Sequence, residues 1–272
     1  MGKRRMSVTV WARVREATAL VASCLLAATV ITGTVKPSPA QAATQTFVTI
    51  EFDDGRADQA TNAGPILAAH NVQGTFFVNS GLIGTAGYMT WDQVGRLAAS
   101  GNEIAGHTVS HVNIGSLSYA EARYQVCQDR INLFNQGYQP TSFAYPSGGV
   151  SDTAKRAVQD CGYNSGRTAG GISKVCKCAE SVPPADPYAT RSAPVLGGTK
   201  ASTLQQIVMN AEANGGGWVQ IFMHSVGTGK SAFPSSELSS FLDWLVSRTS
   251  QGTVTRTVNQ VIGGAVKPPV QP

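Results

Sequence analysis

The segment Val48-Thr49-Ile50-Glu51-Phe52-Asp53-Asp54-Gly55 joins an apolar, β-branched run to two adjacent carboxylates and a glycine. The run predicts a strand, and Asp-Asp-Gly predicts the turn at its carboxyl end. Successive side chains of a strand point to opposite faces, so the two carboxylates need not do the same job. Taken alone, the three residues are equally compatible with an ordinary Asp-rich turn.

A second segment, Gly106-His107-Thr108-Val109-Ser110-His111, places two of the chain's four histidines four residues apart. This spacing lets both imidazoles face one point from a single helical turn or a tight loop. Two histidines and one carboxylate are a common ligand set for Zn²⁺ and other divalent metals, with positions left for water and substrate. The two segments together predict a catalytic metal site.

Residues 1–42 have the pattern of a secretory signal peptide. Five basic residues precede an uncharged, apolar run over residues 17–35, and Ala40-Gln41-Ala42 fits a cleavage site. The alternative is a retained membrane anchor, although the run is marginal in length for a span. We expect an exported, extracellular protein with no membrane attachment after cleavage, one catalytic domain over residues 43–264 and a Pro-rich tail over residues 265–272.

The formal net charge of +5 belongs to the expected leader rather than to the mature protein. The leader holds six basic residues and one acidic residue, so 15 basic and 15 acidic residues remain after its removal. This balance gives no support to nucleic-acid binding. About 230 residues are enough for one large α/β domain, which we expect to be a monomer.

Four cysteines remain once Cys24 is lost with the leader, and an even count in an exported protein suggests two disulfides. We favour Cys127–Cys161, which would tie two neighbouring helices, and Cys176–Cys178, which would close a very tight local loop. A structural zinc site made by all four thiolates is the alternative, although paired C-x-x-C spacing is missing.

Predicted strands alternate with predicted helices along residues 46–262, which indicates a parallel sheet closed or partly closed into a barrel. In such barrels the chemistry gathers at the carboxyl ends of the strands. The polar candidates that follow predicted strands are Asp53, Asp54, His107, His111, Ser147, Arg167 and His224. A long loop over residues 170–189 is a candidate to shape the binding site.

These candidates fall in an ordered set of motifs: Phe52-Asp53-Asp54-Gly55, His107-Thr108-Val109-Ser110-His111, Phe143-Ala144-Tyr145-Pro146-Ser147-Gly148 and Met223-His224. The set resembles the polysaccharide deacetylase family, which is carbohydrate esterase family four with its NodB-type domain. The resemblance covers about residues 45–262. It implies a distorted, partly closed (β/α) barrel and metal-dependent removal of acetyl groups from carbohydrate.

The resemblance also implies roles for single residues. Asp53 is the general base, and Asp54 is the third metal ligand beside His107 and His111. His224 is the general acid, and Met223 lies in the apolar pocket for the acetyl methyl group. Zn²⁺ suits the ligands best, and Co²⁺ or Ni²⁺ would suit them too.

The third motif departs from the family pattern, because Ala144 and Ser147 stand where many members have arginine and tyrosine. The backbone N–H of Ser147 could still bind the oxyanion, and Tyr145 is a further candidate for oxyanion or substrate binding. Arg167 is the candidate to replace the arginine that orients the base. The alternative for Arg167 is an ordinary rim charge.

We therefore expect an enzyme that acts on an acetylated carbohydrate. Polymers or oligomers of N-acetylglucosamine, such as chitin oligomers, peptidoglycan or exopolysaccharide, come ahead of O-acetylated xylan. A serine esterase is the rival enzyme, but the chain has no G-x-S-x-G elbow. A carbohydrate-binding pseudoenzyme is the non-enzymatic alternative, which the retention of Asp53 and His224 opposes.

Overall fold

The computed structural model describes residues 45–272, so the signal peptide expected over residues 1–42 lies outside the described residues. Within residues 45–272, no helix combines the length and the apolar character that crossing a membrane requires.

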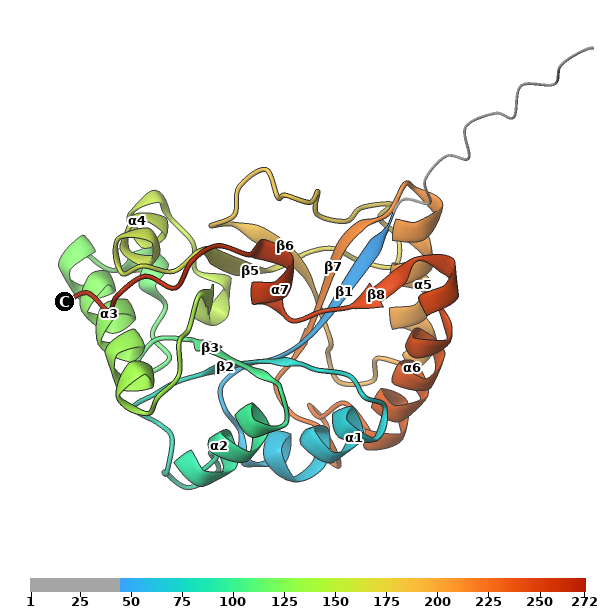
Figure 1. The fold of residues 1–272 in the computed structure, drawn as a ribbon, viewed down its shortest axis with the longest axis horizontal. Helices are drawn as coiled ribbons and strands as arrows, with labels where there is room; N and C mark the ends of the chain where they lie inside the picture. Colours follow the sequence, from blue (N-terminus) through green and yellow to red (C-terminus); the bar gives the residue numbers. More distant parts are fainter. Residues whose placement is uncertain (1–44) are drawn as a thin grey trace, which may run out of the picture. The chain divides into compact units, whose positions relative to one another are not determined.

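Seven parallel strands form a closed ring that helices surround (Figure 1). The ring runs β1 (Thr46–Phe52), β2 (Thr75–Val78), β3 (Glu103–Gly106), β4 (Ser142–Ala144), β5 (Ser165–Gly171), β6 (Thr190–Pro194) and β7 (Gly217–Met223), and then returns to β1. An eighth strand, β8 (Thr253–Thr255), pairs with β1 outside the ring. The predicted distorted (β/α) barrel is therefore confirmed.

Strand β1 is the strand at which the ring closes, and it pairs with three other strands. It matches β7 along its whole length, whereas its first half pairs with β8 and its last two residues pair with β2. The closure between β1 and β2 has only two residue pairs, Glu51 with Thr75 and Phe52 with Phe76. The contact between β3 and β4 is a single pair, Gly106 with Phe143. These short contacts are where the barrel departs from a regular one.

Helices cover the outside of the strands. The α-helices are α1 (Gly64–Ala69), α2 (Trp91–Ala99), α3 (Tyr119–Asn135), α4 (Asp152–Asp160), α5 (Ala201–Ala213), α6 (Ser235–Ser247) and α7 (Val258–Ile262). The shorter turns are the π-helix η1 (Gln59–Ala63) and the 3₁₀-helices η2 (Ile114–Ser116), η3 (Pro146–Gly148) and η4 (Thr249–Gln251). At Gly64-Pro65 the π-helical turn η1 continues directly into α1, because proline in the first turn of a helix has no N–H that needs a partner.

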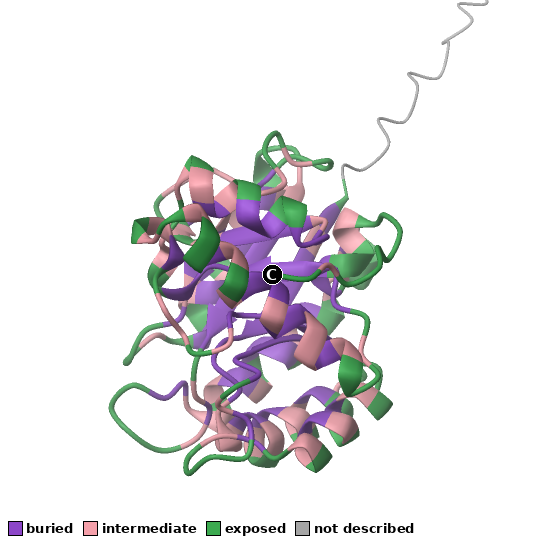
Figure 2. Cartoon of the chain, turned by 90° about the vertical axis from the view of Figure 1, so that its left-hand side faces the viewer, coloured by how far each residue is buried: buried purple, intermediate pink, exposed green. Residues whose placement is uncertain are grey.

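The alternation of β1 separates two environments. Val48, Ile50 and Phe52 join the large apolar cluster beneath the helices, and Figure 2 shows the strands as the buried centre of the domain. Thr49 and Glu51 point the other way, into the barrel. The barrel interior therefore contains polar groups from strands whose outer faces are apolar.

Both predicted disulfides are present. Cys127–Cys161 joins α3 to the end of α4 across 34 residues, and both of its residues are fully buried. Cys176–Cys178 closes a local loop of the chain. With all four sulfurs paired, the alternative of a four-cysteine zinc site is wrong.

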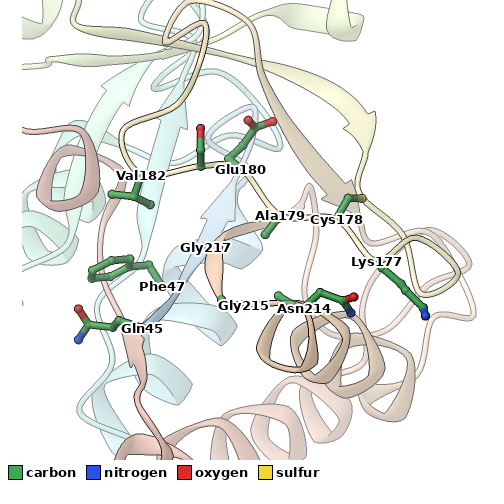
Figure 3. Close-up of a pocket in the computed structure, with 13 residues that line it drawn as sticks. Gln45, Phe47, Lys177, Cys178, Ala179, Glu180, Val182, Asn214, Gly215 and Gly217 are labelled. Atoms are coloured by element: carbon green, nitrogen blue, oxygen red, sulfur yellow. The ribbon is translucent and has the colours of Figure 1, made fainter. Parts of the chain in front are cut away.

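The long loop after β5 does not lie where the sequence suggested. Glu180 pairs with Trp218 at the start of β7, which is the amino end of the barrel, whereas Asp53 follows the carboxyl end of β1. An open cleft of about 660 Å³ lies at this amino end. Figure 3 shows Cys178, Glu180 and Val182 among the residues that line it. The expectation that this loop shapes the binding site is wrong, because it packs at the opposite end of the barrel.

The Pro-rich tail carries no helix or strand, yet it is attached to the domain. The buried Arg130 of α3 donates hydrogen bonds to the carbonyl oxygens of Lys267 and Pro268. Val270 packs on the apolar cluster between α3 and α4.

Candidate metal centre and active site

Asp53 and Asp54 lie at the point where β1 ends and the chain turns. The backbone N–H of Asp53 still donates to the carbonyl of Met223 on β7, but Asp54 and Gly55 both have a φ of 77°. A side chain at Gly55 would meet Ile83 Cδ1 at 2.9 Å, but the positive φ is the main reason that this position favours glycine. The left-handed turn directs the two carboxylates to different neighbours.

Asp54 meets the two histidines of the second segment. Its Oδ1 lies 3.1 Å from Nε2 of His111 and 3.6 Å from Nε2 of His107. One ligand atom from each of the three residues falls within 4.8 Å of the others. The histidines project from a loop rather than a helix, because Thr108 and His111 have positive φ angles of 69° and 59°. The three predicted metal ligands are therefore brought together.

Residues behind the histidines fix their orientation. Nδ1 of His107 lies 2.7 Å from the carbonyl oxygen of Ala144, and a carbonyl only accepts, so the proton sits on Nδ1 and Nε2 presents a lone pair. Asp129 accepts the backbone N–H of His107, and Asn79 donates to the carbonyl of the same residue. Asp129 and Asn79 were not predicted from the sequence. The feature that could have identified Asp129 from the sequence is a carboxylate on the buried face of the helix α3.

The three side chains fit a divalent cation. Oδ1 of Asp54 is buried and has no hydrogen-bond partner within residues 45–272, which is the state expected of a ligand atom. Burial raises the pKa of Asp54, but the neighbouring imidazoles of His107 and His111 outweigh burial and hold that pKa well below its usual range. The donor set is thus one ionised carboxylate oxygen and two imidazole nitrogens, which suits Zn²⁺ and related ions.

Asp53 is held by an arginine from across the barrel. Nη2 of Arg167, on β5, lies 2.6 Å from both carboxylate oxygens of Asp53. Arg167 is 2% exposed, and its guanidinium stacks over the ring of Phe222 at 4.1 Å. The alternative of a rim charge is therefore wrong. Glu51, which the sequence analysis did not single out, lies on the other side of Arg167, with 2.8 Å between Nε and Oε2.

The third motif forms the short helix η3 after β4. Ser147 sits in it with a φ of 57°, which turns its peptide group away from the regular helical direction. Tyr145 does not fit the suggested oxyanion or substrate role. Its N–H donates to the carbonyl of Arg167, and its buried hydroxyl donates to the carbonyl of Tyr188. Of the two candidates, Ser147 alone remains.

His224 follows β7 directly and is exposed to solvent. Gln59 donates to the carbonyl oxygens of both Asp53 and His224, so one amide joins the turns after β1 and β7. Met223 points away from this site, since it belongs to the apolar cluster beneath the helices. Its assignment to an acetyl pocket is wrong, because strand alternation directs Phe222 into the barrel instead. Phe222 contacts the ring of His224 edge-on, with 5.7 Å between ring centroids.

The family model described as polysaccharide deacetylase matches residues 40–166, which include Asp53, Asp54 and both histidines of the cluster. Over residues 40–166, the chain matches the polysaccharide deacetylase family. The second half of the domain, with Arg167 and His224, lies outside this match.

Two relatives are proteins of Bacillus subtilis (strain 168). YxkH, which bears the provisional name polysaccharide deacetylase, is 29% identical over 124 residues, or 44% of this chain and 44% of YxkH. The peptidoglycan-N-acetylmuramic acid deacetylase PdaC is 32% identical over 118 residues, or 42% of this chain and 24% of PdaC. The matched segment thus spans less than half the length of either relative.

A solved structure supports the fold over a larger part of the chain. The Bc1960 peptidoglycan N-acetylglucosamine deacetylase superposes with a TM-score of 0.56 and 18% sequence identity. The superposition covers 83% of this chain and 92% of that one. The barrel, including the half that the family model does not match, therefore has the same fold as that solved structure.

Proposed function

We propose that this protein is a secreted, metal-dependent hydrolase that removes acetyl groups from a carbohydrate rich in N-acetylglucosamine. The observation that carries the proposal is the pair of neighbouring carboxylates with separate partners. Asp54 faces two histidine nitrogens, whereas Asp53 faces a guanidinium. One carboxylate is thus available for a metal and the other for proton transfer, as hydrolysis of an acetyl group requires.

Asp54, His107 and His111 would hold the metal. A divalent cation bound there supplies Lewis-acid chemistry, which polarises an acetyl carbonyl and makes water more acidic. Asp53 accepts the proton from the attacking water, and Arg167 keeps its carboxylate in one orientation. The N–H of Ser147, in the turn beside the histidines' strand, donates to the oxyanion that forms.

The leaving group needs a proton of its own. His224 stands in the turn next to Asp53, because β1 and β7 are neighbours in the ring and Gln59 bonds both turns. Its exposed imidazole can donate a proton to the sugar nitrogen or oxygen as the bond to the acetyl carbon breaks. Hydrolysis thus consumes one water molecule and yields acetate and a sugar with a free amine or hydroxyl.

The proposal of an N-acetylglucosamine substrate is supported by relatives rather than by a residue. Bc1960 is named for peptidoglycan N-acetylglucosamine, whereas PdaC is named for the N-acetylmuramic acid of the same polymer and so supports peptidoglycan only as the polymer. Export is supported by the leader pattern and by the two disulfides, which persist in oxidising compartments. O-acetylated xylan is the alternative substrate class.

Acetate release tests the proposal. The mature protein would be incubated with N-acetylglucosamine oligomers, peptidoglycan and acetylated xylan, first metal-loaded, then after chelation, and then with Zn²⁺, Co²⁺ or Ni²⁺ restored. We expect release from the N-acetylated substrates, loss on chelation and recovery with metal. Activity that survives chelation would indicate a serine-type esterase. Saturable sugar binding without any acetate release would indicate a pseudoenzyme.

A further inference from the structure

An open groove lies beside the loop that carries the histidine ligands, and the proposed reaction does not use it. The groove has a volume of about 410 Å³. Its lining residues are Val112, Leu117, Ala120, Glu121, Tyr124 and Gln125. This volume falls within the range of about 300–1,000 Å³ that small-molecule sites occupy. The groove is therefore large enough for a sugar ring.

The groove is at the same end of the barrel as the proposed metal ligands. Val112 directly follows His111, so their Cα atoms are about 3.8 Å apart. The other lining residues lie just before α3 and in its first two turns. Because α3 returns along the outside of the barrel after β3 has ended, these turns lie at the carboxyl end of the strands. A sugar bonded to the one at the metal can therefore reach the groove.

Tyr124 gives the groove an aromatic surface. It is 52% exposed, and it is the only tyrosine, phenylalanine or tryptophan among residues 45–272 that is exposed. Its ring takes part in none of the aromatic or cation–π pairs of this part of the chain. An aromatic face left open to water beside an active site is suited to stacking on the apolar C–H face of a sugar ring.

The other lining residues match an acetamido group. Val112 and Leu117 are half-buried on the cluster between α3 and α4, and they offer aliphatic surface to a methyl group. Oε1 of Gln125 accepts hydrogen bonds from the N–H and the hydroxyl of Ser110, at 3.2 and 3.3 Å. These bonds fix the amide of Gln125, and its N–H groups donate to no residue between positions 45 and 272. They are available to the carbonyl oxygen of an acetamido group.

The charge of the groove favours a neutral sugar. Glu121 is the only charged residue that lines it, and its carboxylate accepts hydrogen bonds from the N–H and the hydroxyl of Ser118. The lining contains no cation that would pair with a carboxylate on the ligand. An uncharged N-acetylated sugar therefore fits this surface better than an acidic one.

We propose that this groove binds a neutral N-acetylated sugar next to the sugar that loses its acetyl group. The inference rests on the proposed function and narrows its substrate to an oligomer or polymer. The ring of Tyr124 stacks on the sugar, the acetamido methyl contacts Val112 and Leu117, and Gln125 donates to the acetamido carbonyl. The groove touches no reacting atom, so it contributes to KM and not to kcat.

The kinetic test compares two substrates of the metal-loaded protein, a hexamer of N-acetylglucosamine and an aryl acetate that carries no sugar. We expect Tyr124→Ala to raise KM for the hexamer about tenfold, with kcat and the rate on the aryl acetate within about twofold of wild type. Tyr124→Phe keeps the ring and should stay within about twofold of wild type on both substrates. An unchanged KM for the hexamer in Tyr124→Ala would overturn the inference.

Tyr119→Ala is the matched control. Tyr119 is the same residue type on the same helix, but it lies outside the groove and its hydroxyl donates to Asp160. Its replacement should leave KM for the hexamer unchanged. An equal increase of KM in Tyr119→Ala and Tyr124→Ala would show that any tyrosine lost from α3 has this effect, and it would overturn the inference.

Gln125→Glu tests the amide donor. Glutamate keeps an oxygen that accepts from Ser110 but has no N–H to donate to a sugar. We expect KM for the hexamer to increase about fivefold, while Zn²⁺ content after dialysis stays at the wild-type value. Loss of Zn²⁺ without a change in KM would show that Gln125 supports only the histidine loop, and it would exclude Gln125 as a sugar donor.

Binding without turnover separates this inference from the proposed function. Calorimetric titration of metal-loaded Asp53→Asn with the hexamer should give a Kd about tenfold higher when Tyr124→Ala is added. If the wild type releases no acetate from any carbohydrate, the proposed function is wrong, and this difference in Kd still decides the role of the groove. Sedimentation velocity tests the other occupant, a second copy of the chain. A wild-type dimer that Tyr124→Ala dissociates would assign the groove to that copy and overturn the inference.

Discussion

Arg167 Nη2 lies 2.6 Å from both oxygens of the Asp53 carboxylate, although 114 residues separate the two in the chain. Strands β5 and β1 are on different sides of the ring, so the contact crosses the barrel interior. Ala144, on β4, stands where the family pattern of the third motif has arginine, and it is buried in a small cluster with Phe77 and Trp218. The arginine of this chain thus reaches the base from the neighbouring strand, since β4 and β5 pair at Ala144 and Arg167.

Arg167→Lys should lower kcat about 10-fold and Arg167→Ala about 100-fold, with smaller changes in KM. Lysine keeps the charge, but it loses the planar donors that hold Asp53 against the site. Steady-state acetate release at saturating substrate measures kcat directly. Full activity in Arg167→Ala would show that Asp53 needs no orientation by this residue.

Asp53→Asn should keep metal affinity within a few-fold and lower kcat at least about 100-fold, because the amide cannot accept the proton from water. The matched control is Asp58→Asn, which changes a half-buried carboxylate in the next turn that bonds Ser225 instead. Calorimetric titration with Zn²⁺ and acetate release would be measured on the same samples. If Asp58→Asn were as inactive as Asp53→Asn, the loss of activity would come from removing a negative charge near the site rather than from removing the base.

His111→Ala should weaken Zn²⁺ binding at least about 100-fold, because it removes one of three ligands. His70→Ala is the control, since His70 bonds the carbonyl of Ile66 and the carboxylate of Asp243 away from the cluster. Metal content after dialysis against a weak chelator is the measurement. Equal metal retention by the two variants would exclude His111 as a ligand.

Glu51 should make the free energy of unfolding depend on pH. Its pKa in the folded protein is about 8, against an ordinary value of 4.5, so the folded state holds a proton that the unfolded state has lost between these two values. The stability due to this proton is fully present below pH 4.5 and decreases as pH rises to 8. Glu51→Gln should therefore gain stability relative to wild type from pH 5 to pH 8. Urea unfolding at each pH measures this difference.

The two disulfides should differ in their contribution to stability. Replacing Cys127 and Cys161 by serine should cost about 4 kcal/mol, because their bond closes a long loop, whereas the same change at Cys176 and Cys178 should cost about 1.6 kcal/mol. Urea unfolding of both double variants gives the comparison. The prediction is that the loss in free energy of unfolding is larger for the Cys127/Cys161 variant than for the Cys176/Cys178 variant. The opposite result would mean that the loop at the amino end of the barrel stabilises the domain more than its length suggests.

Much of the fold could be predicted from the sequence, because its signals are local. The apolar run before Asp53, the capping boxes at Thr90 and Ser118 and the alternation of strands and helices depend only on neighbouring residues. Parallel strands joined by helices leave few topologies, so the ends of the strands could be expected to meet. A site made of His107, His111 and one of the two neighbouring carboxylates followed from that reasoning, whereas the choice of Asp54 as the ligand came from the family resemblance.

The sequence by itself determined which residues stand at the strand ends and therefore which ligands could meet. Only the tertiary structure decided the partners inside the barrel, because these depend on the face that each strand turns inward and on the register between strands. A shift of one residue exchanges the two faces, and for this reason Phe222 rather than Met223 lies beside His224. The same geometry buries Glu51 against Arg167, a contact that no local pattern marks, and sends the loop that carries Glu180 to the opposite end of the barrel.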